Sequence, residues 1–111
     1  MFADLEKKWE GMKMSDGGNV FRTRVRVLTR EGLHARPASQ IADMLSHHDA
    51  RLTLVKEGEA ADCSSVLDLL ILAAGFNSEL ELLAEGPDAR EAMDEVSGFF
   101  ARKFELEEPV R

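Results

Sequence analysis

Apolar and polar residues alternate over three stretches of the chain, which is the period-two pattern of half-buried β-strands. The first stretch, 21–27, alternates apolar side chains with arginines, and the others lie at 51–56 and 78–85. The Glu-Gly pair at 57–58 indicates a turn, so a short strand at 59–62 is expected to complete a hairpin with the second stretch. The pattern therefore predicts four strands.

Apolar residues spaced three and four positions apart predict helices at 37–47, at 65–74 and from 89 to 104. Pro37 suits the first turn of a helix, where a missing N–H costs nothing. The element order is then β-α-β-β-α-β-α, and all three helices need a sheet face to cover. The economical arrangement is a two-layer α+β domain, an antiparallel sheet with helices on one side.

The two ends of the chain depart from this pattern. One apolar stripe of a short helix is predicted over 2–13, formed by Phe2, Leu5, Trp9 and Met12. The sequence MSDGGN at 14–19 then indicates a flexible break. We therefore expect an N-terminal extension over 1–19 that is flexible or a short helix, a domain over 20–104, and a charged C-terminal tail over 105–111.

A length of 111 residues, with 44% hydrophobic residues, suits one domain with a modest core. The net charge of −7 argues against a general nucleic-acid-binding protein, because phosphate backbones need a basic surface. The longest apolar run, 69–76, is too short to cross a membrane, and the N-terminus has charges where a signal peptide needs its apolar core. A single cysteine, Cys63, suits a reducing compartment. We expect an acidic cytoplasmic protein.

One short segment is basic within this acidic chain. Residues 20–36 hold five arginines and one glutamate, a net charge of +4. Three of these arginines, Arg22, Arg24 and Arg26, alternate along the first strand, and the simplest interpretation is a solvated strand face. The arginine nearest a histidine, Arg36, calls for a separate interpretation.

Candidate chemistry is concentrated in the sequence GLHARP at 32–37, which places His34 at a strand-to-helix turn. Helix N-termini present unpaired N–H groups and about half a positive charge, which favours an anion. An imidazole with an ordinary pKa of about 6.5 can attack phosphorus at neutral pH. The phosphoryl oxygens could then accept hydrogen bonds from the helix and from Arg36. The residues alone leave open that His34 is only a helix cap or a surface residue.

The sequence EGLHARPA closely resembles the active-site signature of HPr, the histidine-containing phosphocarrier family of the bacterial phosphoenolpyruvate:sugar phosphotransferase system. The resemblance extends from about Val20 to Phe104. It implies an open-faced β-sandwich, in which three helices cover one face of a four-stranded antiparallel sheet. It also implies that enzyme I phosphorylates His34 on Nδ1, that Arg36 stabilises the phosphoryl group, and that an enzyme IIA domain receives it. Such a protein is a monomeric transfer intermediate without a cofactor, rather than an enzyme.

The resemblance further implies a partner surface around the first two helices, for which the candidates are Ala35, Gln40, Val66, Leu67 and Leu70. Ser65 matches the family's regulatory serine, which an ATP-dependent HPr kinase/phosphorylase modifies in many bacteria. A phosphate at a helix N-terminus is favourably placed. However, Ser65 and Asp68 also have the spacing of a capping box, so a plain helix cap is the alternative.

Some positions depart from the family pattern. Glu31 stands where many relatives have Asn or Ser, and a carboxylate there would either repel a phosphoryl group or raise the basicity of His34. The first two helices contain Asp43 and Asp68 but no lysine, whereas sugar-transporting relatives often carry lysines there. The alternative is therefore a regulatory phosphoprotein, nitrogen-type or kinase-linked, that controls its partners by its phosphorylation state without sugar transport.

A metal site formed by His34, His47 and His48 is excluded by the predicted fold. The 13 positions from His34 to His47 correspond to roughly 20 Å of helix, too far for ligands about 2 Å from one zinc ion. Cys63 is expected to be a small buried residue rather than a nucleophile. A generic α+β ligand-binding module would require an inert His34.

Overall fold

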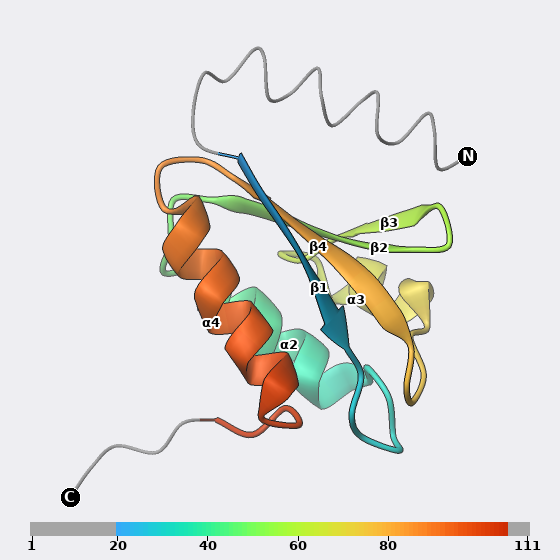
Figure 1. Ribbon diagram of the computed structural model, residues 1–111. Helices are drawn as coiled ribbons and strands as arrows, with labels where there is room; N and C mark the ends of the chain where they lie inside the picture. The colour runs from blue at the N-terminus through green and yellow to red at the C-terminus, as the bar shows by residue number, and fades with distance from the viewer. Residues whose placement is uncertain (1–19, 107–111) are drawn as a thin grey trace, which may run out of the picture.

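The computed structural model describes residues 20–106, which form four strands and three helices (Figure 1). Along the chain these are β1 (Val20–Arg26), α2 (Ala35–Leu45), β2 (Arg51–Lys56), β3 (Glu59–Asp62), α3 (Val66–Leu72), β4 (Glu79–Glu85) and α4 (Ala89–Ala101). The predicted element order is confirmed. The helix predicted at 2–13, the break at 14–19 and most of the tail lie outside the described residues.

The strands form one antiparallel sheet in the order β1-β4-β2-β3. Leu82 of β4 lies between Thr23 of β1 and Leu54 of β2. The predicted hairpin joins β2 to β3 through Glu57 and Gly58, whose φ angles are +50° and +84°. Two successive positive φ values match the right-handed twist of a two-residue hairpin.

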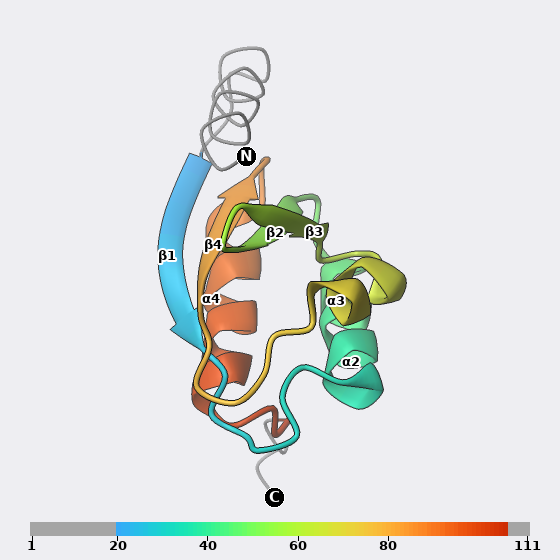
Figure 2. The ribbon, with the colours of Figure 1, turned by 90° about the vertical axis from the view of Figure 1, so that its right-hand side faces the viewer.

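All three helices lie on one face of the sheet, and no described element covers the other face (Figure 2). Side chains of a strand alternate between the two faces, so Leu80 and Leu82 of β4 point toward the helices. They join Ile41 of α2, Leu69 of α3 and Phe99 of α4 in one buried core. The predicted two-layer α+β fold with helices on one face is therefore confirmed.

The helix predicted at 37–47 occupies Ala35–Leu45 instead. It begins two residues earlier because only the φ angle of Pro37 is fixed, and the two residues before it still adopt helical geometry. It ends before His47, whose N–H donates to the Met44 carbonyl oxygen in a tighter turn (3.2 Å). His47, which the predicted range included, therefore follows the helix together with His48.

The second helix is also shorter than the predicted 65–74, because Ser65 is its N-cap and Ala73 its C-cap. Ala73 has φ 56° and ψ 46°, the left-handed conformation that commonly ends helices, and its N–H donates to the Leu70 carbonyl oxygen at 3.1 Å. The helix therefore ends at Leu72, two residues before the predicted end at 74.

The last helix ends at Ala101, not at Phe104. Lys103 and Phe104 both have φ near +60°, and the Phe104 N–H donates back to the Phe99 carbonyl oxygen at 2.9 Å. This reversal returns the Phe104 ring to within 5.0 Å of the Phe100 ring, measured between centroids. The apolar stripe of this helix was predicted correctly. However, its last member, Phe104, packs against the core from a turn that follows the helix. No helix within residues 20–106 has the length and apolar character to cross a bilayer.

Candidate functional site

The loop before α2 is fixed to the chain that follows α3. The Leu33 N–H donates to the Ala74 carbonyl oxygen at 2.8 Å, and Gly32 before it has φ +74°. A Cβ atom at Gly32 would lie 2.8 Å from that same oxygen and 3.1 Å from the Gly75 Cα. Only glycine tolerates both the positive φ and the close approach. A backbone contact therefore positions His34, the residue after Leu33.

His34 is the N-cap of α2, and its side chain is exposed. Its backbone is extended, and its ring makes no capping hydrogen bond. The His34 carbonyl oxygen accepts from the Ala38 N–H at 3.0 Å, whereas no described backbone group accepts from the N–H of Ala35 or Arg36. The first turn contains no acidic residue. The positive end of the helix therefore lies open at the base of His34, which suits an anion.

Arg36 lies in this first turn, with its side chain exposed. Among the described residues, its guanidinium forms no hydrogen bond or ion pair. It is therefore free to bind an anion held near His34, in the two-pronged geometry that arginine offers to phosphate oxygens. Glu31 is also exposed, and no hydrogen bond joins its carboxylate to the His34 ring in the described part of the chain.

Ser65 is half-buried and caps α3. Its Oγ accepts from the Asp68 N–H at 3.1 Å, as the capping-box spacing predicts. In a full capping box, the Asp68 carboxylate would also accept a hydrogen bond from the Ser65 N–H. Here that carboxylate accepts from the Asp62 N–H at 3.3 Å instead, and the Ser65 N–H donates to the Asp62 carbonyl oxygen. The neighbouring Ser64 is exposed and donates its hydroxyl to Asp62 Oδ1 at 2.7 Å. Two carboxylates therefore surround the pair of serines.

The candidate partner surface divides between exposed and half-buried positions. Leu67 is 66% exposed and Leu70 38%. Ala35 is exposed near His34, whereas Gln40 is half-buried, with its side-chain Oε1 lacking a hydrogen-bond partner in the described part of the chain. Val66 packs partly against the core. Leu67 and Leu70 therefore form the apolar part of this surface.

The structure adds Ile71, which is 66% exposed and was not among the candidates. It lies four residues after Leu67 and follows Leu70, so these three residues share one side of α3. The sequence VLDLLIL already indicated such a patch, because six of its seven residues are large and apolar. One face of a helix cannot bury all six against the core, so some of them must be exposed. We call Leu67, Leu70 and Ile71 the α3 apolar patch. It belongs to the helix whose C-terminal end anchors the loop of His34.

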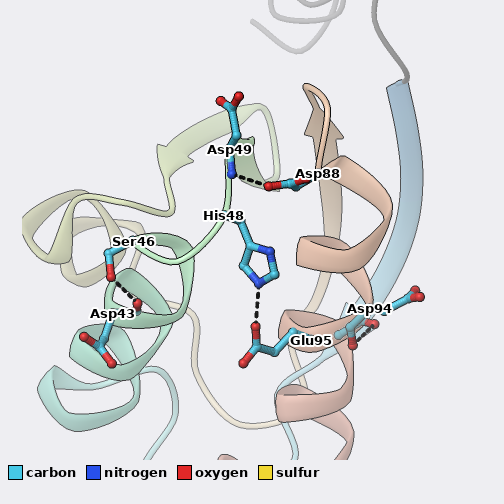
Figure 3. A network of polar contacts seen from close by, with 8 residues as sticks. Asp43, Ser46, His48, Asp49, Asp88, Asp94 and Glu95 are labelled. Atoms are coloured by element: carbon cyan, nitrogen blue, oxygen red, sulfur yellow. Dashed lines mark hydrogen bonds and ion pairs between the residues drawn. The ribbon is translucent and has the colours of Figure 1, made fainter.

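The remaining candidate residues do not join His34. His48 follows the C-terminal end of α2 and bonds through Nε2 to Glu95 Oε1 of α4 at 2.8 Å (Figure 3). Cys63 is fully buried, and burial raises the pKa of its thiol far above the ordinary value, with the charge of Asp62 acting in the same direction. A thiol held in its protonated form is a poor nucleophile, as predicted for this residue.

Residues 21–102 match the family described as "PTS HPr component phosphorylation site". The phosphocarrier protein HPr of Treponema pallidum is 42% identical over 83 residues, which cover 75% of this chain and 94% of that protein. The phosphocarrier protein NPr of Shewanella violacea is 37% identical over 82 residues, covering 74% and 90%. HPr of Chlamydia trachomatis is 30% identical over 102 residues, covering 90% of each chain.

The fold has a close counterpart among solved structures as well. The crystal structure of HPr from Bacillus anthracis superimposes with a TM-score of 0.68 at 29% sequence identity, covering 72% of this chain and 95% of that one. The matched region spans every described helix and strand except the first residue of β1. This chain therefore belongs to the HPr family of phosphocarriers of the phosphotransferase system.

Proposed function

We propose that His34 is the residue of this phosphocarrier that accepts a phosphoryl group from phosphorylated enzyme I and passes it to an enzyme IIA-type domain. The observation that carries the proposal is the exposed, uncapped imidazole at the N-terminus of α2. In the first transfer, the Nδ1 lone pair forms a bond to phosphorus while the bond from phosphorus to the donor breaks, and the donor keeps that electron pair. In the second transfer, His34 is the group that leaves.

The surroundings of His34 favour the phosphorylated form. Its oxygens carry negative charge, which the open N–H groups of Ala35 and Arg36 and the positive end of α2 stabilise. The Arg36 guanidinium supplies charge-assisted hydrogen bonds, each worth about 1.5–3 kcal/mol. Loss of that stabilisation in the transition state corresponds to a rate reduction of about 10–100-fold. We therefore expect Arg36→Ala to slow transfer by this factor and Arg36→Lys to restore part of it.

The test is incubation of the full chain with labelled phosphoenolpyruvate and enzyme I of the same organism. We expect acid-labile, alkali-stable label on the wild type and none on His34→Ala. The matched control is His47→Ala, because His47 is an exposed histidine that follows the other end of α2. Full labelling of His34→Ala would assign the acceptor to another residue, and an unlabelled wild type would remove the carrier role.

The α3 apolar patch supports a docking role beside the phosphorylation site. Leu67 and Ile71 each expose two thirds of their surface, which gives a partner protein apolar area to bury. We expect Leu67→Lys to raise the KM for enzyme I without changing the unfolding temperature. Arg90→Glu is the matched control, since Arg90 is an exposed residue on α4. Equal KM values for Leu67→Lys and wild type would argue against this surface.

The regulatory branch of the family is the second candidate function. In α2 and α3 there is one basic residue, Arg36, against Asp43 and Asp68, and no lysine to meet an acidic sugar-specific partner. The resemblance to the Shewanella violacea NPr is compatible with this branch. Phosphoryl transfer from the labelled chain to a nitrogen-type IIA domain and to a sugar-specific IIA domain distinguishes the two. Faster transfer to the sugar-specific domain would favour transport.

Ser65 is the residue we propose for regulation by an HPr kinase/phosphorylase. Phosphate on an N-cap lies at the positive end of the helix, which favours it, whereas the nearby Asp62 and Asp68 carboxylates oppose it. Labelling with ATP and kinase separates the acceptors: label should survive in Ser64→Ala and disappear in Ser65→Ala. Absence of label on the wild type would leave Ser65 as a helix cap only.

A further inference from the structure

One exposed aromatic side chain lies in the turn between α3 and β4, outside the α3 apolar patch. Phe76 is 57% exposed, and no other aromatic residue in the described part of the chain is exposed. In this turn the Ser78 N–H donates to the Gly75 carbonyl oxygen at 3.1 Å, and Asn77 has φ +72°. These are the features of a type II turn, with Phe76 at its first central position.

Backbone hydrogen bonds hold this turn on both sides of the exposed ring. Before the ring, the Ala74 carbonyl oxygen accepts from the Leu33 N–H. After it, the Asn77 N–H donates to the Val27 carbonyl oxygen at 2.7 Å. Val27 and Leu33 are the two ends of the segment that leads from β1 to His34. The turn is therefore tied at two points to the loop that carries His34.

Leu28 adds a second exposed apolar side chain beside this turn. It follows Val27 directly and is 37% exposed. Val27 pairs with the turn in an antiparallel sense, since its N–H also donates to the Ser78 carbonyl oxygen at 3.0 Å. In an antiparallel pair, the residue that follows on one chain lies beside the residue that precedes on the other. Leu28 and Phe76 therefore occupy neighbouring backbone positions, and we call these two residues the turn patch.

The turn patch lies within the area that a protein covers when it reacts with His34. The path from Phe76 to Ala74, across the hydrogen bond to Leu33 and on to His34, spans at most about 18 Å between the first and last Cα atoms. A standard protein interface covers about 800 Å² of each partner, equivalent to a disc about 32 Å across. An interface of this size that contains His34 therefore has room for the turn patch.

We propose that the turn patch is a docking site for phosphorylated enzyme I, with the Phe76 ring inserted in an apolar pocket of that protein. This inference rests on the proposed role of His34, because every phosphorylation of His34 brings the donor to its Nδ1 atom. Aromatic residues are enriched in the core of protein interfaces. The backbone bonds of the turn hold Phe76 in place before binding, which reduces the entropy lost on association.

The test measures KM and kcat of the full chain as a substrate of enzyme I from the same organism. We expect Phe76→Ser to raise the KM about 10-fold, because a buried anchor is lost, while kcat stays within about twofold of the wild type. Phe76→Leu should restore most of the affinity. The matched control is Leu106→Ser, which should leave the KM unchanged. Leu106 is 54% exposed, but it lines a groove with Met44, near the other end of α2 from His34.

Labelled phosphoramidate separates docking from an effect on His34 itself, because this small donor transfers its phosphoryl group to an imidazole nitrogen and releases ammonia without any partner protein. Phe76→Ser and the wild type should be labelled by it at the same rate. A lower rate in Phe76→Ser would overturn the proposal, since Phe76 would then act by positioning the loop.

Two results with enzyme I would also overturn the proposal. One is an unchanged KM for Phe76→Ser. The other is an effect confined to transfer onto the enzyme IIA-type domain, which would assign the turn patch to the acceptor. A wild type that neither donor labels would overturn the proposed role of His34 and this proposal with it, whereas a labelled wild type with an unchanged KM in Phe76→Ser overturns the docking site alone.

Discussion

Replacement of Gly32 by alanine tests the backbone contact that positions His34, the proposed phosphorylation site. Gly32 has φ +74°, a conformation that disfavours any residue with a Cβ atom. In Gly32→Ala the new Cβ would lie 2.8 Å from the Ala74 carbonyl oxygen, the acceptor of the Leu33 N–H. The obstacle on the other side is backbone, which cannot rotate away as a side chain would. The loop that carries His34 must therefore separate from the end of α3.

The magnitude follows from two contributions. Holding alanine in the left-handed region costs about 1–2 kcal/mol. Weakening the hydrogen bond between Leu33 and Ala74 removes about 1 kcal/mol more. The sum, about 2–3 kcal/mol, corresponds to a fall in Tm of roughly 10–20 °C for a domain of this size. Displacement of His34 by about 1 Å would also slow phosphoryl transfer by up to about 100-fold.

Urea unfolding followed by circular dichroism measures the stability change, and transfer from enzyme I at a temperature where the variant is folded measures the positional effect. Gly75→Ala is the matched control, because a Cβ there meets nothing within 4 Å and its φ lies outside the left-handed region. It should change the free energy of unfolding by no more than about 0.5–1 kcal/mol. The reasoning fails if Gly32→Ala lowers the free energy of unfolding by no more than Gly75→Ala does. It also fails if Gly32→Ala transfers the phosphoryl group at the wild-type rate.

Three further predictions concern α3 and the residues that directly precede and follow it. Ala73→Gly should raise the free energy of unfolding by about 1 kcal/mol, because Ala73 holds a left-handed C-cap, and urea unfolding should show a higher midpoint. Ser65→Ala should lower the same quantity by about 1 kcal/mol through loss of the bond from the Asp68 N–H, and Ser64→Ala should have the smaller effect. Because burial raises the pKa of the Cys63 thiol, a thiol reagent at pH 8 should react with it only after the protein unfolds; rapid modification of the native chain would contradict this.

The fold was predictable because its signals are local and repeated. Three of the four strands alternate over several residues, and burial of one side of such a strand permits one register only. The helices likewise have enough apolar residues for the 3.6-residue period to be read. The predicted ends of the helices were wrong, because each end depends on single residues whose conformation is set by distant neighbours. Ala73 ends α3 in a left-handed conformation that alanine alone does not favour, although Gly75 lies two residues further on.

The reversal at Phe104 was unpredictable for a similar reason. Its sequence position continues the apolar stripe of α4, and helical spacing correctly predicts that it is part of the core. The positive φ angles of Lys103 and Phe104 follow instead from contacts that Phe104 makes with Phe99 and Phe100 after the helix has ended. Periodicity indicates which residues are buried, but not whether the backbone between them remains helical.

The sequence motif predicted where the candidate site lies, at the start of α2, but not which contacts hold the site in place. Neither His34 nor Arg36 is held by its own side chain in the described structure; the hydrogen bonds that position them belong to the backbone of Leu33 and Ala38. A phosphocarrier must present the same histidine to a donor and to an acceptor, so side-chain bonds within the molecule would have to break at each transfer. Anchoring the loop through Gly32 gives positional accuracy without occupying the imidazole. The positive φ of Gly32, more than the identity of the residues around it, is therefore the feature that makes an exposed histidine an accurately placed one.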